Sequence, residues 1–357
     1  MRRAVVLDSI AVIAVTIENL SDAASSIELE KNTSPIRKDS HFEGITQDFL
    51  KLFPGKLPYS ILLMVIFADL LLYISLSAEI EFLTLVPYFF LSLFSLIFAK
   101  YLDLRGSALS IQVRILDRLK IVLKGIAFIL LALSSLRILN HLTMSIAFPF
   151  ADSMLAKSDV ALGLNWLAYF NFVEIYPLLK IPLETAYVLF DAASFAGFIL
   201  LVLCGYFRRA KFFCEVFLIA ATISISIGFL FPALSAPIHF FGMVDTLPGY
   251  DKVPGAYHLE HMMALRAADT PVVNLFSVPG LVTFPSFHTA GGVILIICFL
   301  RTKLVWPVSA YSLTMIASAP IFGGHYFIDQ IAGAMLATAV CMLIAKRSCY
   351  TRLFTDF

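Results

Sequence analysis

The sequence predicts an all-α protein that crosses a membrane about eight times. Of its 357 residues, 60% are hydrophobic and only 14% are charged. In soluble domains, by comparison, roughly half of the residues are apolar and roughly a quarter are charged. The mean hydropathy is +0.88. The apolar residues gather in runs close to the roughly 20 residues that a helix needs to cross a bilayer. Because backbone polar groups in lipid must bond to each other, we interpret these runs as helices.

Residues 1–57 precede the first long apolar run and form a predicted cytoplasmic arm. The beginning of the arm has an apolar face typical of a helix that lies on a membrane surface, made of Val6, Ile10, Ile13, Ile17 and Leu20. A cleaved signal peptide is the less favoured alternative, because Asp8 interrupts the apolar run and no clear cleavage site follows. Residues 21–57 are polar and mixed in charge, so we expect a loop there.

The apolar runs that follow give the predicted transmembrane helices. They lie at residues 58–78, 82–101, 121–139, 184–205, 213–234, 284–301, 303–320 and 325–345. Lys and Arg accumulate in short cytoplasmic loops, and here they are concentrated in every second connection. We therefore expect both termini in the cytoplasm. The predicted outer connections are 79–81, 140–183, 235–283 and 321–324.

Two of the outer connections are long. The first, 140–183, interleaves aromatic and polar residues and is too interrupted to span. We expect it in the membrane interface, with Trp166, Tyr169 and Tyr176 at headgroup depth. The second, 235–283, carries Tyr257, His258, His261 and Arg266.

Charge and cysteine content exclude other classes of protein. A net charge of +1 without a basic cluster argues against a nucleic-acid partner. The five cysteines lie in or beside apolar segments and have no CxxC or Cys/His spacing, so we predict no disulfide.

Asp69 and Asp191 fall inside apolar runs, where a carboxylate is costly. We expect both to face the bundle interior in structural hydrogen bonds, with Asp191 as a candidate to line a headgroup cavity.

The stretch GGHYFID contains the first set of candidate catalytic residues. His325 and Asp329 are four residues apart and share one face of a helix. The carboxylate can fix the tautomer of the imidazole and leave its other nitrogen as a nucleophile or base. Gly323 and Gly324 allow a tight turn and close approach by a ligand. Alone, such a pair could equally be polar residues at a membrane interface.

The stretch FPSFHTAGG contains the second set. Pro285 suits the first turn of a helix. The backbone donors of Ser286, Phe287 and His288, with the Ser286 hydroxyl, would then form an anion site. His288 beside such a site is placed to protonate a leaving oxygen.

Arg266 is the predicted phosphate-binding cation, because a guanidinium binds phosphate oxygens bidentately. An arginine that reaches to lipid headgroups is the alternative. His258 and His261 are candidates for further phosphate or headgroup contacts. A zinc site is less favoured, because no HExxH or three-ligand spacing is present.

At these residues the chain resembles the type 2 phosphatidic acid phosphatase superfamily, and specifically its branch with the inositolphosphorylceramide synthases, which are inositolphosphotransferases. The superfamily pattern has a basic motif that ends in Arg, then PSGH, then SR followed by His and Asp at fixed spacing. Here Pro285 to His288 read PSFH, with Phe287 in place of Gly. The third motif appears as Ser318 and Ala319, followed by His325 and Asp329.

The resemblance implies a role for each of these residues. His325 would be the nucleophile that forms a phosphohistidine, Asp329 would orient it, and His288 would be the general acid. Arg266 and Ser286 would bind the phosphoryl oxygens, and neither metal nor cofactor would be needed. The chain departs from the pattern where Ala319 replaces the Arg of the third motif and Leu259 replaces the Lys of the first. His258, His261 and Tyr257 are candidates to supply part of that contact.

The resemblance also implies the domain organisation. The superfamily core has six helices, which corresponds to residues 121–345 as the catalytic membrane domain. Residues 58–120 would then be an addition of two helices and a basic loop, and 346–357 a cytoplasmic tail.

The predicted function is that of a membrane enzyme with its active site on the extracytoplasmic side. It would act on a lipid phosphoester or a lipid-linked diphosphate, either as a lipid phosphatase or as a transferase of the inositolphosphorylceramide-synthase kind. Its partners would be membrane lipids. A transporter or flippase-like protein and a non-catalytic scaffold that keeps the fold are the alternatives.

Overall fold

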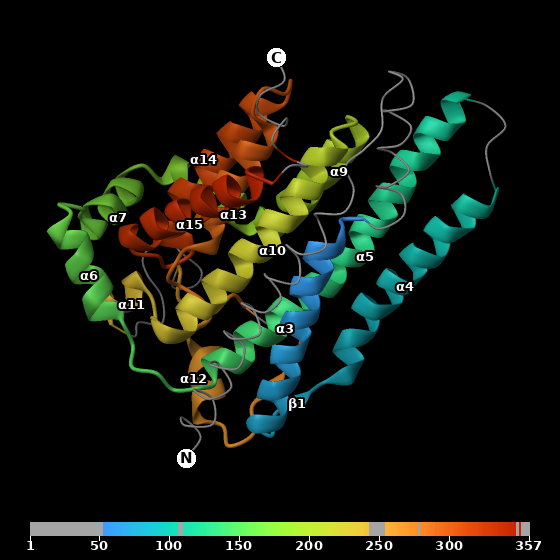
Figure 1. Ribbon diagram of the computed structural model, residues 1–357. Coiled ribbons are helices and arrows are strands. Elements are labelled where there is room, and N and C mark those ends of the chain that lie inside the picture. Colours follow the sequence, from blue (N-terminus) through green and yellow to red (C-terminus); the bar gives the residue numbers. More distant parts are fainter. Residues whose placement is uncertain (1–52, 106–109, 243–253, 278, 348–349, 351–357) are drawn as a thin grey trace.

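Apolar helices form a bundle in the computed structural model, which describes residues 53–105, 110–242, 254–277, 279–347 and 350 (Figure 1). The predicted surface helix at the beginning of the chain lies outside the described residues. Six helices are long and apolar enough to cross a membrane, and a bent pair of helices gives a seventh crossing if it is counted as one span. The chain is therefore a multi-pass membrane protein.

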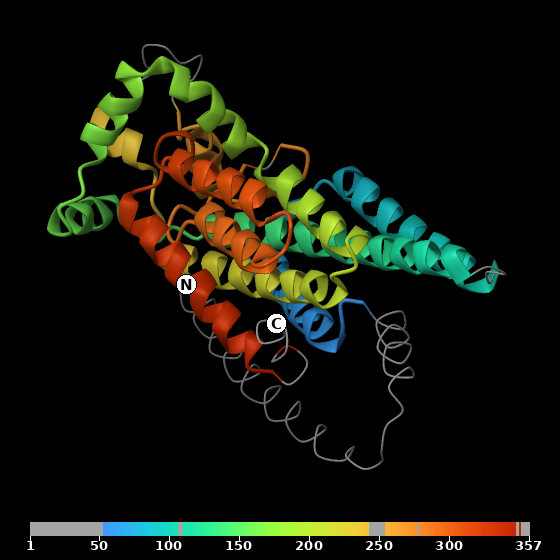
Figure 2. The same cartoon turned by 90° about the horizontal axis from the view of Figure 1, so that it is seen from above.

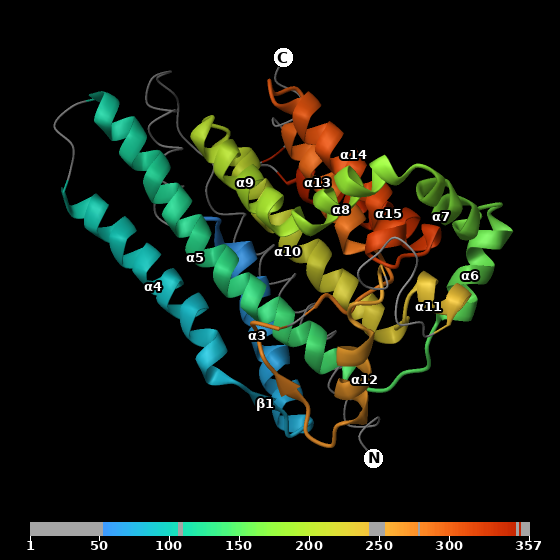
Figure 3. The same cartoon turned by 180° about the vertical axis from the view of Figure 1, so that it is seen from behind.

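The first three helices form one side of the bundle. Helix α3 spans Lys56–Ser75, α4 spans Phe82–Arg105 and α5 spans Ser110–Met144. Both α3 and α4 pack against α5, and α4 lies at the edge of the molecule in Figures 1 and 3. The turn between α3 and α4 contains β1, Glu79–Ile80, which pairs in parallel with β2, Val272–Val273. This pair joins two connections that we predicted to lie on the same side of the membrane.

The remaining long helices surround α10, Phe207–Leu230, which contacts α3, α5, α9, α13 and α15 (Figure 2). The helices on this side of the bundle are α8, Lys180–Val188; α9, Phe190–Leu203; α13, Phe287–Phe299; α14, Val305–Phe322; and α15, Phe327–Ala345. A short 3₁₀ turn, η2, spans Pro177–Leu179. The segment Pro177–Val188 bends by 61° relative to Phe190–Leu203, so the helix that we predicted at 184–205 is broken.

One predicted helix is shorter than expected. The apolar run at 284–301 gives only the 13-residue α13. It begins after Ser286, which caps it, and ends where Leu300 becomes extended and Arg301 adopts a left-handed φ of 59°. A helix of 13 residues rises about 20 Å, which is less than the hydrocarbon thickness. Alone, α13 is therefore too short to cross the membrane.

The connection predicted to lie in the interface contains two helices, α6 (Asp152–Ala161) and α7 (Trp166–Ile175). Trp166 is 1% exposed and stacks between Phe170 and Phe240, and its Nε1 donates to the Pro320 carbonyl. The indole N–H therefore has its partner inside the protein, and the expectation that Trp166 lies at headgroup depth stays a prediction. The side chain of Tyr176 is exposed.

Two short helices complete the fold near the start of α15. Helix α11 spans Ala236–Phe241, and α12 spans Leu259–Ala267 and packs against α5. They belong to the second long connection that we predicted on the outer side.

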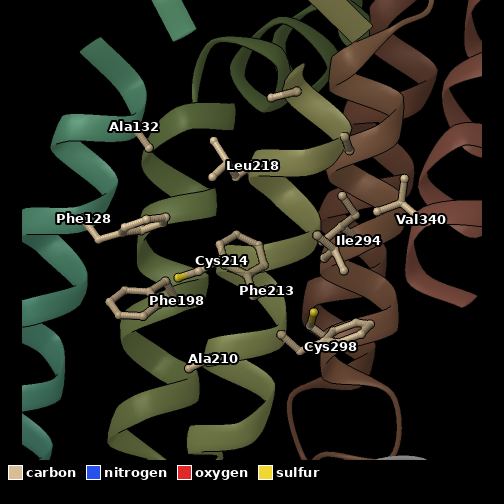
Figure 4. Packing of buried hydrophobic residues seen from close by; sticks show 14 of the residues in the cluster. Phe128, Ala132, Phe198, Ala210, Phe213, Cys214, Leu218, Ile294, Cys298 and Val340 are labelled. Atoms are coloured by element: carbon tan, nitrogen blue, oxygen red, sulfur yellow. The ribbon is translucent and has the colours of Figure 1, made fainter. Parts of the chain in front are cut away.

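The main hydrophobic core lies between α5, α9, α10 and α13 (Figure 4). The rings of Phe128, Phe198 and Phe213 and the thiol of Cys214 fill the layer between these helices. Gly125 lies against Phe198, and a Cβ at this position would collide with the ring. The absence of a side chain at Gly125 therefore allows α5 and α9 to approach each other closely.

Substitution of Gly125 tests this close approach. We expect Gly125→Ala to lower the stability by about 1–3 kcal/mol, because the fully buried ring of Phe198 would have to shift. The measurement is the melting temperature of the purified protein in detergent. Gly280→Ala is the control, because a Cβ there would have no neighbour within 4 Å among the described residues. Equal melting temperatures of the two variants would contradict this packing.

Candidate active site

The two predicted catalytic histidines come together from separate helices. His288 is the second residue of α13, and His325 lies in the turn between α14 and α15. Their ring centroids are 6.1 Å apart. Nδ1 of His325 lies 3.4 Å from Oδ2 of Asp329 in the first turn of α15. The structure therefore places both imidazoles and the carboxylate in one group.

A backbone contact between the starts of α13 and α15 sets this arrangement. The Ser286 amide donates to the Asp329 carbonyl at 2.9 Å. Gly333 lies against the Ser286 carbonyl, which a Cβ would strike. The Ser286 hydroxyl is fully buried and accepts hydrogen bonds from the amide and the hydroxyl of Thr289. The predicted anion site on α13 therefore lacks the Ser286 amide, which is already bonded within the protein.

The two glycines before His325 serve protein packing. Gly324 has a φ of +68°, and its α-carbon faces the Gly255 carbonyl and Ser235. Its own carbonyl accepts a hydrogen bond from the Ala236 amide at 2.8 Å. We expected this position to admit a ligand, but another segment of the chain fills the space. The positive φ and the close contact both require glycine here.

Carboxylates from two helices bind the free amides at the start of α15. Asp329 accepts from the Tyr326 amide at 2.9 Å. Asp159 of α6 accepts from the amides of Phe327 and Ile328 at 2.9 and 2.7 Å. Asp329 thus lies close to His325, but its hydrogen bond goes to Tyr326. Asp159 was not a sequence candidate, because nothing near it in the sequence indicates which helix it caps.

A third buried carboxylate, Asp152, contacts Tyr326, the residue that follows His325. It accepts hydrogen bonds from the amides of Leu234 and Ser235 and from the Tyr326 hydroxyl. His258 contacts the neighbouring Leu234 carbonyl through Nε2 at 2.6 Å. A carbonyl can only accept, so this nitrogen of His258 carries the proton.

Burial keeps the histidines outside the membrane helices neutral. It lowers the pKa of His325 to about 4, although a hydrogen bond to the Thr283 backbone acts in the opposite direction. It also lowers the pKa of His258 to about 4, with the nearby His325 lowering it further. A neutral imidazole has a lone pair available for attack. His325 is therefore in the protonation state that a nucleophile needs at neutral pH.

His288 faces a cavity of about 780 Å³. Its ring stacks on Tyr187 at 4.2 Å and lies 4.7 Å from the Phe190 ring. The Tyr187 hydroxyl is 3.1 Å from that of Tyr257, which also lines the cavity. His325 is 2% exposed and is not part of the lining. It therefore lies behind His288 as seen from the cavity.

Two other residues that were predicted to contact phosphate lie outside the lining of this cavity. Arg266 donates to the Phe148 carbonyl at 3.0 Å and stacks over the Phe150 ring. Burial lowers its pKa, and the nearby Asp152 carboxylate opposes that effect. His261 packs edge-on against His141, with ring centroids 5.0 Å apart. Neither Arg266 nor His261 lines the cavity beside His288.

Several buried polar atoms have no hydrogen-bond partner among the described residues. They include Nε and Nη2 of Arg266, Nδ1 of His258 and Oγ of Ser235. Buried donors without partners are costly and uncommon. Ser235 adjoins Gly324, and His258 lies within electrostatic range of His325. The guanidinium of Arg266 and the hydroxyl of Ser235 are donors, whereas Nδ1 of His258 is an acceptor, because the proton of this neutral imidazole is on Nε2. No group of three or more His, Cys, Asp or Glu residues in the described part of the chain could hold a metal ion.

The lining of the cavity contains charged residues, and of these the sequence analysis selected only Asp191, as a candidate to line a headgroup cavity. Lys180, Glu184 and Asp191 line it from α8 and α9, and Arg137 lines it from α5. The spacing of Lys180, Glu184 and Tyr187 places them on one face of α8, and this polar face in an apolar segment was the missed signal. The side chain of Asp191 is 68% exposed, so the expected interior position is wrong for it. Asp69 is buried and accepts a hydrogen bond from Ser135, as predicted.

Residues 153–343 match the family model described as the PAP2 superfamily. The matched region begins in α6 and ends in α15, so it contains His288, His325 and Asp329. No curated protein and no solved structure matches the chain.

Removal of the Asp159 carboxylate tests its contact with α15. We expect Asp159→Ala to lower the stability by about 1–2 kcal/mol, because two amides at the start of α15 lose their acceptor. The melting temperature in detergent measures this loss. The control is Ser158→Ala, because among the described residues the Ser158 hydroxyl bonds only to the Met154 carbonyl of the same helix. A variant of Asp159 as stable as this control would contradict the assignment.

The two lowered histidine pKa values predict a pH dependence of stability. In the folded protein His258 and His325 have pKa values of about 4, whereas in the unfolded chain the pKa of a histidine is 6.5. Both residues therefore bind protons less readily in the folded protein. Stability is therefore lost as the pH falls from 6.5 towards 4, by up to about 3 kcal/mol for each residue. Melting temperatures measured between about pH 7 and pH 5 should fall, and less steeply for His258→Gln. A constant melting temperature would contradict the neutral burial of these residues.

Proposed function

The chain belongs to the PAP2 superfamily, and from this premise we propose that it transfers a phosphoryl or phosphoalcohol group from a lipid phosphoester or a lipid-linked diphosphate. Membership supports phosphatase-like function in a membrane. The proposal adds the identity of the nucleophile, the class of substrate and the side of the membrane on which the reaction takes place.

The convergence of two imidazoles and one carboxylate carries this proposal. His288 and His325 have ring centroids 6.1 Å apart, and His325 lies 3.4 Å from Asp329. A phosphorus atom between the rings would have a nucleophile on one side and an acid on the other. The guanidinium of Arg266 and the hydroxyl of Ser235 have buried donors without partners among the described residues, and they are candidates to bind its oxygens.

The proposed reaction has two steps. In the first, the free nitrogen of His325 forms a bond to phosphorus, the bond from phosphorus to the leaving oxygen breaks, and His288 gives that oxygen a proton. For this step His288 must first be protonated. In the second, water or a hydroxyl attacks the phosphohistidine, His288 takes back a proton, and the bond between nitrogen and phosphorus breaks. Asp329 is the positioning residue for the imidazole of His325.

The cavity supports a lipid as the substrate. Its lining combines the apolar Leu133, Leu136 and Ile225 with the charged and hydroxyl groups around His288. A molecule with an acyl chain and a phosphate headgroup presents both kinds of surface. The distribution of Lys and Arg along the sequence supports a site on the extracytoplasmic side.

The second reactant determines which enzyme this is. Attack by water would make it a lipid phosphatase, and attack by a lipid hydroxyl would make it a transferase like the inositolphosphorylceramide synthases. Purified protein in detergent, incubated with candidate lipids, separates the two. Free phosphate would indicate the phosphatase, and a new phospholipid would indicate the transferase.

Substitution of His325 tests the proposed nucleophile. We expect His325→Ala to reduce turnover on the order of 10³-fold or more, because no covalent intermediate can form. His288→Ala should reduce it by about 10²–10⁴-fold through loss of the proton donor. The measurements are product formation and an acid-labile phosphoryl label on the protein, which should be absent from His325→Ala.

His239→Ala is the matched control, because His239 is an exposed histidine in the same region. It should retain both turnover and labelling. Normal turnover by a folded His325→Ala variant would contradict the proposal and favour the transporter or the scaffold.

A further inference from the structure

Arg137 lies inside an apolar helix that is long enough to cross the membrane. The candidate span of α5 runs over Ile115–Met144. Its guanidinium donates from Nη1 to the Tyr88 hydroxyl at 3.0 Å and from Nη2 to Asp191 at 3.3 Å. These contacts come from α4 and α9, so three helices fix its direction. A charged residue within a membrane helix is costly and usually marks a functional site.

The contacts of Arg137 within the protein do not account for this cost. Arg137 and Asp191 are 29% and 68% exposed, and exposed ion pairs contribute little to stability. An apolar residue at this position would serve the packing of α5 at least as well. The structure therefore favours a role in binding.

Arg137 lines the same cavity as His288. Its partner Asp191 directly follows Phe190, whose ring lies 4.7 Å from His288. Tyr187, near the end of α8, stacks on His288. Arg137 is thus held against the wall of the cavity to which the proposed acid belongs.

Lys180 is a second cation on this wall. It lies on the same face of α8 as Tyr187, and its ammonium is 3.0 Å from Glu174. Glu184 and Asp191 also line the cavity, so the charges along the wall are mixed. An anion in the cavity is attracted to the two cations and repelled by the two carboxylates, which restricts where it can bind.

We propose that Arg137, assisted by Lys180, binds the phosphate group of the lipid headgroup on the cavity side of His288. The guanidinium can hold two phosphate oxygens at once. This inference rests on the proposed function for the nature of the ligand, and it identifies a binding residue outside all the sequence motifs.

Phosphate binding to the purified protein tests the inference. The rise in melting temperature is followed as inorganic phosphate replaces chloride at constant ionic strength. We expect Arg137→Gln to need about tenfold more phosphate to reach half of the maximal rise in melting temperature, because a charge-assisted hydrogen bond is lost. Arg118→Gln is the matched control on the same helix, because Arg118 bonds only to the Leu203 carbonyl among the described residues, away from the cavity. It should behave as the unmodified protein does.

Two further arms make the test decisive. Tyr88→Phe keeps the charge of Arg137 but removes one of the hydrogen bonds that direct its guanidinium. It should weaken phosphate binding about threefold. This variant tests the inference even if Arg137→Gln does not fold. Dihexanoyl phosphatidic acid replaces inorganic phosphate in the second arm. Tighter, Arg137-dependent binding of this lipid supports a headgroup site, whereas equal binding of the two ligands overturns it.

The outcomes separate this inference from the proposed function. Phosphate that does not bind to the unmodified protein, or that binds equally well to the Arg137 and Tyr88 variants, overturns the Arg137 site. Binding does not require His325 to react, so His325→Ala should retain the dependence on Arg137. Normal turnover by His325→Ala would contradict the function but would leave the binding result unaffected.

Discussion

The hydrogen bond between the starts of α13 and α15 is the constraint on which the site depends. Ser286 donates to the Asp329 carbonyl, and Gly333 leaves no side chain between the two backbones. With these helix starts in contact, His288 and His325 have little freedom to separate, and their rings lie 6.1 Å apart. Catalysis by positioned groups requires this kind of rigidity, because small displacements of reacting atoms are costly in rate.

The buried carboxylates around α15 strengthen the same constraint. Asp152, Asp159 and Asp329 accept hydrogen bonds from backbone amides, which offsets much of the cost of burying charge. They also occupy the amides of Tyr326, Phe327 and Ile328. The start of α15 is therefore not free to bind a phosphate. An anion near His325 would depend on side chains instead, and among the described residues Arg266 and Ser235 have buried donors without partners.

Local patterns in the sequence predicted most of the membrane helices and the pairing of His325 with Asp329. The missed features depend on contacts that are remote in sequence. Asp159 caps a helix that begins 168 residues later, and no spacing rule reveals such a partner. The burial of Trp166 was not predicted, because its acceptor, the Pro320 carbonyl, is 154 residues away in the sequence. The shortness of α13 follows from its cap and from the backbone turn at Arg301, which hydropathy does not report.

The relative depth of the two histidines gives the proposed reaction a direction. His288 lines the cavity, whereas His325 lies behind it and is almost completely buried. In phosphoryl transfer the attacking and leaving atoms lie roughly in line on opposite sides of phosphorus. If His325 attacks from behind, the leaving oxygen must point into the cavity, where His288 can protonate it. The lipid part of the leaving group would then lie against the apolar lining, and the acceptor would enter from the same side after it departs.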